Sequence, residues 1–216
     1  MVPYYDRDGI VIYHGDCRDV LPSIDPDSVD LLLTDPPYGI NVDTDYSGRM
    51  HRTDKSKTWD RRVGGDDVPF NPSLLDVFPR RILWGANYYS DVLPLGSWVV
   101  WRKRGVSPVL SECEMAWHNL GGKRVSFFES AHVNTTAKDG KLHPTQKPAA
   151  LMRWIVDRWT KPGDLVLDPY MGSGPVAQAC HELGRRYIGV ELVEDYCKVA
   201  VGRLAQQTLD LDGGAA

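Results

Sequence analysis

The chain has 216 residues, 42% of them hydrophobic and 25% charged, so it can bury one sizeable core, and we expect a single domain over residues 1–216. It has no run of about 18 apolar residues and does not begin with a basic-then-apolar signal pattern, which predicts a cytoplasmic protein without a membrane segment. The net charge is −4 and the four cysteines are scattered, so the sequence predicts no metal site, no disulfide framework and no general coating of positive charge.

The first two predicted strands each end at an acidic residue. Residues 11–13 form a short apolar run that ends at Gly15 and Asp16, and residues 18–24 then suit a single short helix. Residues 29–34 are a second apolar run, and they lead directly into Asp35 and the tripeptide that follows it. Both carboxylates are therefore expected in loops at strand ends.

The tetrapeptide Asp35-Pro36-Pro37-Tyr38 has the chemistry of a pocket for an amino group on a flat ring. The two prolines have no N–H, so their carbonyls can only accept, and a carboxylate and an aromatic ring flank them. An exocyclic amine can donate to Asp35 and to a proline carbonyl while its ring stacks on Tyr38. A rigid acidic turn after a strand is the alternative interpretation.

Residues 41–67 have few apolar residues and many basic ones, so we expect a long loop. Its position after the tetrapeptide would allow it to hold a phosphate backbone while a base enters the pocket. A solvated insertion would have a similar composition. The candidate DNA-binding residues are Arg49, Arg52, Lys55, Lys57, Arg61 and Arg62.

The middle of the chain alternates between predicted helices and strands, which indicates an α/β fold. Helices are expected over residues 72–78 and 107–118, and strands over residues 81–85, 97–101 and 125–132. The basic run Arg102–Arg104 follows a strand and can add to a basic surface or form a solvated turn.

A helix is predicted after His143-Pro144-Thr145-Gln146-Lys147-Pro148, with Thr145 as a candidate N-cap. Apolar residues recur at helical spacing from Leu151 to Trp159, and Lys161-Pro162-Gly163 ends the run.

A second group of candidate site residues follows the predicted apolar strand at residues 164–167. Asp168 and Tyr170 precede the glycine-rich turn Gly172-Ser173-Gly174, and Pro175 suits the first position of the next helix. Glu191 ends the following strand, where an acidic residue can accept hydrogen bonds from two ribose hydroxyls. A last helix is expected from residue 194 to about residue 204, and a flexible tail over residues 209–216.

These glycines also resemble a dinucleotide fingerprint, so an NAD-linked oxidoreductase is an alternative. The fingerprint usually begins its domain, however, and here too little chain follows it for a second mononucleotide-binding half. A P-loop is excluded because no Gly-Lys-Ser or Gly-Lys-Thr follows the glycines.

Taken together and in this order, Gly15-Asp16, Asp35-Pro36-Pro37-Tyr38, the His143–Pro148 motif and Asp168–Gly174 with Glu191 resemble S-adenosylmethionine-dependent DNA amino-methyltransferases of the permuted β class. The resemblance covers most of the chain. It implies a Rossmann-like fold with circularly permuted motif order, in which helices cover both faces of a mostly parallel, seven-stranded sheet. It also implies the cofactor S-adenosylmethionine and double-stranded DNA as the substrate.

The resemblance further assigns roles to residues. The flipped base would lie against Asp35, Pro36, Pro37 and Tyr38, with its amine directed at the sulfonium methyl group. The cofactor would contact Asp16 through its adenine amine, Thr145 and Lys147 at its methionine end, and Glu191 through its ribose. The remaining cofactor contacts would be Asp168, Tyr170, Gly172 and Gly174.

Asp at position 35 favours adenine N6 in this family, whereas Ser there is commoner for cytosine N4, which remains the main alternative. Related Asn-Pro-Pro-Tyr enzymes methylate protein glutamine, and an inactive DNA-binding relic of the fold is also compatible with the sequence. Pro175 replaces the threonine that family members often carry, which removes one N–H and one hydroxyl.

No segment is long enough for a separate target-recognition domain. Sequence recognition would therefore fall to residues 41–67, to residues 102–142, to a partner or to a second subunit, so the sequence leaves open a homodimer and pairing with a restriction endonuclease.

Overall fold

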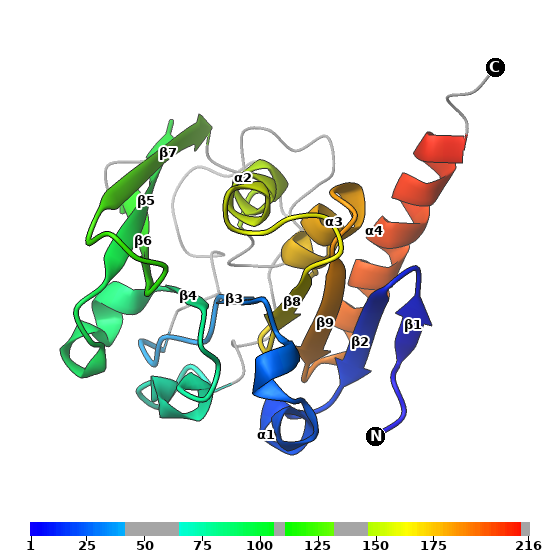
Figure 1. Ribbon diagram of the computed structural model, residues 1–216, viewed down its shortest axis with the longest axis horizontal. Helices are drawn as coiled ribbons and strands as arrows, with labels where there is room; N and C mark the ends of the chain where they lie inside the picture. The colour runs from blue at the N-terminus through cyan, green and yellow to red at the C-terminus, as the bar shows by residue number, and fades with distance from the viewer. Residues whose placement is uncertain (42–64, 106–110, 132–146, 213–216) are drawn as a thin grey trace, which may run out of the picture.

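The computed structural model describes residues 1–41, 65–105, 111–131 and 147–212. Within them, nine strands form one sheet in the order β1-β2-β9-β8-β3-β4-β6-β5-β7, with β1 and β7 at the two edges (Figure 1). The strands are β1 (Tyr5–Arg7), β2 (Ile10–His14), β3 (Leu31–Thr34), β4 (Arg81–Trp84), β5 (Ser97–Arg104), β6 (Cys113–His118), β7 (Val125–Ala131), β8 (Leu165–Asp168) and β9 (Arg186–Glu191).

The five strands from β2 to β4 in the sheet order are mutually parallel, so their carboxyl ends lie along one edge. All four residues of β3, of β4 and of β8 are buried, because helices or short helical turns cover both faces of this part of the sheet. This burial explains the uninterrupted apolar runs in the sequence. The open edge left by the strand ends is where an α/β sheet of this kind binds ligands.

Two hydrophobic layers enclose the sheet. The longer helices α2 (Ala149–Trp159), α3 (Pro175–Glu182) and α4 (Glu194–Asp212) cover one face, where Leu151 and Ile155 of α2 join the core. The other face is covered by α1 (Cys17–Val20) and by short 3₁₀ turns, as Figure 1 shows. The turns are η1 (Leu21–Ser23), η2 (Pro26–Ser28), η3 (Pro72–Leu75), η4 (Ala86–Tyr88) and η5 (Ser90–Val92).

The predicted mostly parallel sheet with helices on both faces is confirmed, but the expected number of seven strands is wrong for the described residues. The strand β1 adds an antiparallel edge beside β2, and β6 runs antiparallel to both β4 and β5.

The largest error of the sequence prediction concerns residues 107–118, where a helix was expected. The structure has the strand β6 over Cys113–His118, inserted between β4 and β5. The apolar run Met115–Trp117 fits either state, and pairing with the two neighbouring strands decides between them.

Smaller differences concern the bounds of helices. The expected helices at residues 18–24 and 72–78 are mainly short turns, and α2 has Pro148, not Thr145, at its N-cap. Pro175 is the first residue of α3, as expected. The helix α4 continues to Asp212, so it includes part of the segment that was predicted to be a tail.

Among the residues that the structure describes, no helix is long and apolar enough to cross a membrane.

Candidate active site

A cavity of about 700 Å³ opens at the carboxyl edge of the parallel strands. Its walls come from the loops after β2, β3, β8 and β9, together with residues 68–71 and the segment that leads into α2. This volume is in the range of pockets that bind small molecules. The predicted site residues that line it are Asp16, Asp35, Pro36, Pro37, Tyr38, Lys147, Asp168, Tyr170, Gly172 and Glu191.

The Asp35 carboxylate is held by two neighbours inside this cavity. The Lys147 ammonium donates to Asp35 Oδ2 at 2.5 Å and to the Tyr38 hydroxyl at 3.1 Å. The Tyr38 hydroxyl in turn donates to Asp35 Oδ1. The resemblance assigned Lys147 to the methionine end of the cofactor, and the structure places its charged end on the proposed catalytic carboxylate.

Lys147 also reaches a second carboxylate that the sequence did not single out. Its Nζ lies 2.9 Å from Glu114 Oε2 on β6, and the Lys103 Nζ on β5 lies 2.8 Å from the other Glu114 oxygen. The two lysine side chains are only 3% and 8% exposed. Two buried cations and two carboxylates therefore alternate in the order Lys103, Glu114, Lys147, Asp35, and we call these four residues the charge chain.

Burial disfavours the charged forms in the charge chain, and the ion pairs act against it. At Glu114, the nearby Lys147 and Lys103 outweigh burial and lower the pKa to about 2. Asp35 and Glu114 likewise outweigh the burial of Lys147 and raise its pKa above the ordinary lysine value. At Asp35, burial dominates and raises the pKa, while Lys147 acts in the opposite direction. Lys147 therefore limits the rise in the pKa of Asp35.

Tyr38 is fixed by its surroundings as well as by its hydroxyl. Its ring stacks on Tyr88 with centroids 5.1 Å apart and planes 19° apart. The Asp66 carboxylate, which is 4% exposed, accepts hydrogen bonds from the backbone N–H of Tyr38 at 2.9 Å and of Gly39 at 2.9 Å. Hydrogen bonds to Asp66, near the end of the basic segment 41–67, thus fix the backbone of the loop after β3.

Gly85 gives Tyr38 its space, because a Cβ atom there would lie 1.9 Å from Cε1 of the tyrosine ring. We expect Gly85→Ala to lower the free energy of unfolding by about 1–3 kcal/mol more than Gly163→Ala, since the added methyl overpacks the site. Gly163 is the matched control because its φ of +87° is similar to the +67° of Gly85, but a Cβ there meets nothing within 4 Å. Urea unfolding of both variants measures the difference, and equal destabilisation would refute the proposed clash.

Asp168 lies at the end of β8 in a buried hydrogen-bond network. Its Oδ1 accepts from the Thr34 hydroxyl at 2.7 Å and from the Tyr170 N–H at 3.2 Å, and the Tyr187 hydroxyl lies 3.4 Å from Oδ2. Burial raises the pKa of Asp168 to about 7, although the hydrogen bonds from Thr34 and Tyr170 act to lower it. Its charge therefore changes near neutral pH.

Glu191 braces the glycine-rich turn at the end of β9. One carboxylate oxygen accepts from the Gly172 N–H at 2.9 Å and the other from the Val193 N–H at 2.8 Å. A carboxylate has further lone pairs, so both oxygens retain capacity for ligand hydroxyls. Asp16 lies after the neighbouring strand β2, where Arg18 donates to it at 2.9 Å through Nε.

The remaining predicted site residues do not enter this geometry. Gly174 is not among the lining residues, and a Cβ there would lie 2.7 Å from the Ala200 side chain, so its smallness serves the contact between α3 and α4. Thr145 and the six basic candidates Arg49, Arg52, Lys55, Lys57, Arg61 and Arg62 lie outside the described residues.

Sequence reasoning missed Glu114, Lys103, Asp66 and Thr34. Lys103 was grouped with the surface charges of Arg102–Arg104, but only the two arginines are largely exposed, and both pair with Glu129. A glutamate at an inward position of an apolar strand would have been a signal for Glu114, had that segment been recognised as a strand.

Comparison with known proteins agrees with this architecture. The structure is similar to the PvuII DNA methyltransferase (cytosine-N4-specific), with a TM-score of 0.64, 16% identity and coverage of 93% of this chain and 88% of that one. It is also similar to the M1.HpyAVI-SAM complex, with a TM-score of 0.62, 24% identity and coverage of 90% and 99%. These likenesses show a Rossmann-like methyltransferase fold.

The sequence is 25% identical to the Type II methyltransferase M2.DpnII of Streptococcus pneumoniae, over 94% of this chain and 92% of the relative. A family model described as DNA methylase (N6_N4_Mtase) matches residues 80–202, more than half of the chain. The match includes the glycine-rich turn and Glu191, which the NAD-linked alternative also invoked, and it decides against that alternative. The chain belongs to the N6/N4 DNA methylase family.

Proposed function

We propose that the protein transfers a methyl group from S-adenosylmethionine to the N6 amine of a flipped adenine in double-stranded DNA. The observation that carries the proposal is that one cavity contains both the Asp35–Tyr38 loop and the acidic residues Asp168 and Glu191. The residues that can bind the target amine and the residues that can bind the nucleoside cofactor therefore face the same cavity.

The residues present suit the cofactor. Glu191 has free lone pairs for ribose hydroxyls, Asp16 is an acceptor for the adenine amine, and Asp168 is a buried carboxylate toward the cationic methionine end. When bound, the cofactor supplies an electrophilic methyl group on a sulfonium. The protein itself binds the amine that receives the methyl group and accepts the proton that this amine releases.

Asp35 has two tasks in this mechanism. As a carboxylate it accepts a hydrogen bond from the exocyclic N–H, which increases the electron density on the nitrogen that attacks the methyl group. The methylated nitrogen then carries one proton too many, and Asp35 is the adjacent base that can receive it. Lys147 favours the ionised form of Asp35 before transfer through its 2.5 Å ion pair. No covalent enzyme intermediate is required, because an amine is itself the nucleophile.

The choice of adenine over cytosine depends on Asp35, since aspartate at this position favours adenine in the family. The test is transfer of labelled methyl from S-adenosylmethionine to unmethylated DNA, followed by nucleoside analysis. Label in N6-methyladenine is expected. Label in N4-methylcytosine would retain the mechanism and overturn the base, and absence of label in DNA would overturn the proposed function.

DNA contact is assigned to the basic segment 41–67, in particular to Arg49, Arg52, Lys55, Lys57, Arg61 and Arg62. The support is its composition and the position of both its ends at the cavity, since Pro37, Tyr38 and Asp66 line the wall. Relatives such as M2.DpnII are Type II methyltransferases, which makes a role beside a restriction endonuclease the natural setting to test. A second subunit is a further source of DNA contacts.

We expect cofactor affinity to rise with pH because of Asp168. Its pKa near 7 makes it neutral at pH 5.5 and mostly ionised at pH 7.5, and the ionised form attracts a cationic ligand. The dissociation constant should be about fivefold lower at pH 7.5, corresponding to about 1 kcal/mol of charge attraction. The α-ammonium of the cofactor stays mostly protonated over this range.

Asp168→Asn is the matched variant, since an amide oxygen can still accept from Thr34 and Tyr170. Calorimetric titration should give a nearly constant affinity for it between pH 5.5 and pH 7.5. An unchanged pH dependence of binding in the variant would exclude this role of Asp168.

The raised pKa of Asp168 also means that the native state retains a proton that the unfolded chain releases above about pH 4, so the free energy of unfolding falls as the pH rises toward 7.

A further inference from the structure

Glu114 lies behind the active site rather than in it. It is not among the residues that line the cavity, yet one of its oxygens lies 2.9 Å from the Lys147 ammonium that holds Asp35. Its other oxygen lies 2.8 Å from the Lys103 ammonium. Glu114 thus connects the catalytic ion pair to a second buried cation.

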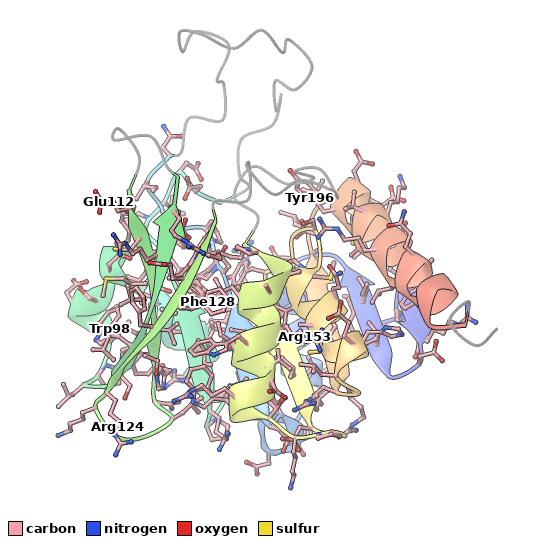
Figure 2. All side chains as sticks on the ribbon, turned by 90° about the horizontal axis from the view of Figure 1, so that it is seen from above. Trp98, Glu112, Arg124, Phe128, Arg153 and Tyr196 are labelled. Carbon is pink, nitrogen blue, oxygen red and sulfur yellow. The ribbon has the colours of Figure 1, made fainter. Side chains whose placement is uncertain are left out.

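The strand β6 brings Glu114 to this place because it runs opposite to the strands around it. Its first residues therefore lie at the edge where the parallel strands end, and Figure 2 shows Glu112, just before β6, at the same edge as Tyr196, which lines the cavity. Arg124, which precedes β7, lies at the opposite edge. Glu114 is paired in register with Trp101 on β5, two residues before Lys103, so both side chains project from the same face.

The Lys147 ammonium has three N–H donors and, among the residues that the structure describes, three acceptors. These acceptors are Asp35 Oδ2 at 2.5 Å, Glu114 Oε2 at 2.9 Å and the Tyr38 hydroxyl at 3.1 Å. The lysine side chain is flexible, so its ammonium group is fixed in position only when its N–H donors bind acceptors that lie in different directions. Glu114 supplies the one acceptor that does not belong to the loop after β3.

We propose that Glu114 is a positioning residue for methyl transfer, which fixes the Lys147 ammonium against Asp35 from the β6 side while Lys103 neutralises its second oxygen. The inference rests on the proposed function, because it assigns Glu114 a role in the reaction at Asp35. Without Glu114, the Lys147 ammonium loses one hydrogen-bond acceptor and one negative neighbour. Its position becomes less fixed, so the Asp35 carboxylate that orients the target amine is also less well placed.

The pH dependence supplies a readout that damage to packing would not move. The titratable groups that face the Lys147 ammonium are Asp35 and Tyr38 after β3 and Glu114 on β6, with Lys103 on β5 beyond Glu114 and Tyr89 behind Asp35. Burial lowers the pKa of Lys147, and Asp35 and Glu114 both raise it. If Glu114 loses its charge, only Asp35 still raises this pKa. The pKa of Lys147 then falls, and activity is lost at a lower alkaline pH.

The test is Glu114→Gln, compared with Glu129→Gln as the matched control. Glu129 lies on β7 and pairs with Arg102 and Arg104 at the surface, so the same chemical change weakens only these two surface ion pairs. For Glu114→Gln we expect kcat about 10- to 100-fold lower at pH 7.5, as for a small misplacement of a reacting group. The S-adenosylmethionine dissociation constant should stay within about twofold of the wild-type value. The ratio of kcat at pH 10 to kcat at pH 7.5 should be lower than in the wild type, because the raised pKa of Lys147 keeps the wild-type ammonium charged at pH 10.

A double-mutant cycle with Lys147→Met separates positioning from general damage. If Glu114 acts through Lys147, the double variant should be no slower than Lys147→Met alone, whereas independent effects would multiply. Multiplying effects, or a wild-type kcat and pH profile in Glu114→Gln, would overturn the inference and leave the proposed function intact. Wild-type protein that binds the cofactor without methylating DNA would overturn both.

Should Glu114→Gln fail to fold, Lys103→Met tests the same chain from its other end. It frees the second Glu114 oxygen, and we expect a kcat about fivefold lower with an unshifted alkaline limb, because Lys147 keeps both carboxylates. A wild-type kcat in this variant would contradict the proposal.

Discussion

Asp35→Ala should remove nearly all methyl transfer while cofactor binding stays close to the wild-type value. The variant removes the acceptor of the target amine and the adjacent base, so we expect kcat to fall by about 10²- to 10⁴-fold. The fold should survive, because Lys147 keeps Glu114 as a partner and the remaining buried charges still alternate. Single-turnover transfer of labelled methyl, together with calorimetric titration of S-adenosylmethionine, measures the two properties separately.

Asp91→Ala is the control for this experiment, since Asp91 is exposed, lies in η5 and does not line the cavity. It should transfer methyl at the wild-type rate. Full activity in Asp35→Ala would remove the basis of the mechanism.

Glu191→Ala should have the reverse effect of Asp35→Ala, with weakened cofactor binding as the primary defect, because Glu191 holds the glycine-rich turn and faces the cavity.

Lys147→Met should produce an enzyme whose activity depends on pH in a new way. Removal of the ammonium leaves burial unopposed at Asp35, so the pKa of that carboxyl rises further above its ordinary value. We expect kcat at pH 7 to fall by about 10²- to 10³-fold and to recover in part as the pH is raised, because ionisation of Asp35 then requires a higher pH than in the wild type. A pH–rate profile of single-turnover transfer measures the shift.

Lys198→Met is the matched control, since Lys198 forms exposed ion pairs with Glu194 and Asp195 on α4. Its pH profile should equal that of the wild type. A uniform loss of activity at all pH values in Lys147→Met, without recovery in alkaline solution, would show that Lys147 acts by shape rather than through the charge of Asp35.

The sequence was informative wherever local chemistry and chain order coincide. The buried runs before Asp35 and before Asp168 predicted the central strands β3 and β8, and the glycine-rich turn with Pro175 predicted the start of α3. These features depend on neighbours in the chain, so a single sequence contains the information. The order of the motifs then indicated the family, which the match over residues 80–202 confirms.

Features that depend on pairing between distant segments could not be predicted in this way. Lys103 and Glu114 are on different strands, and their contact with Lys147 exists only because β5, β6 and the segment before α2 meet at one edge. Thr34 and Asp168 are 134 positions apart and share a hydrogen bond. Charge runs such as Arg102–Arg104 give no sign of which member is buried, since strand alternation turns Lys103 inward and its neighbours outward.

The reversed direction of β6 places a constraint on the length of the chain that no pocket residue reveals. Side chains alternate between the faces of a strand, so a register slip of one residue would turn Glu114 to the opposite face of the sheet. Insertion or deletion of a single residue within β6, between Glu114 and Trp117, is therefore expected to uncouple Lys147 from its second carboxylate, even if the rest of the strand still pairs. Homologues with a different spacing there must hold the lysine by other means.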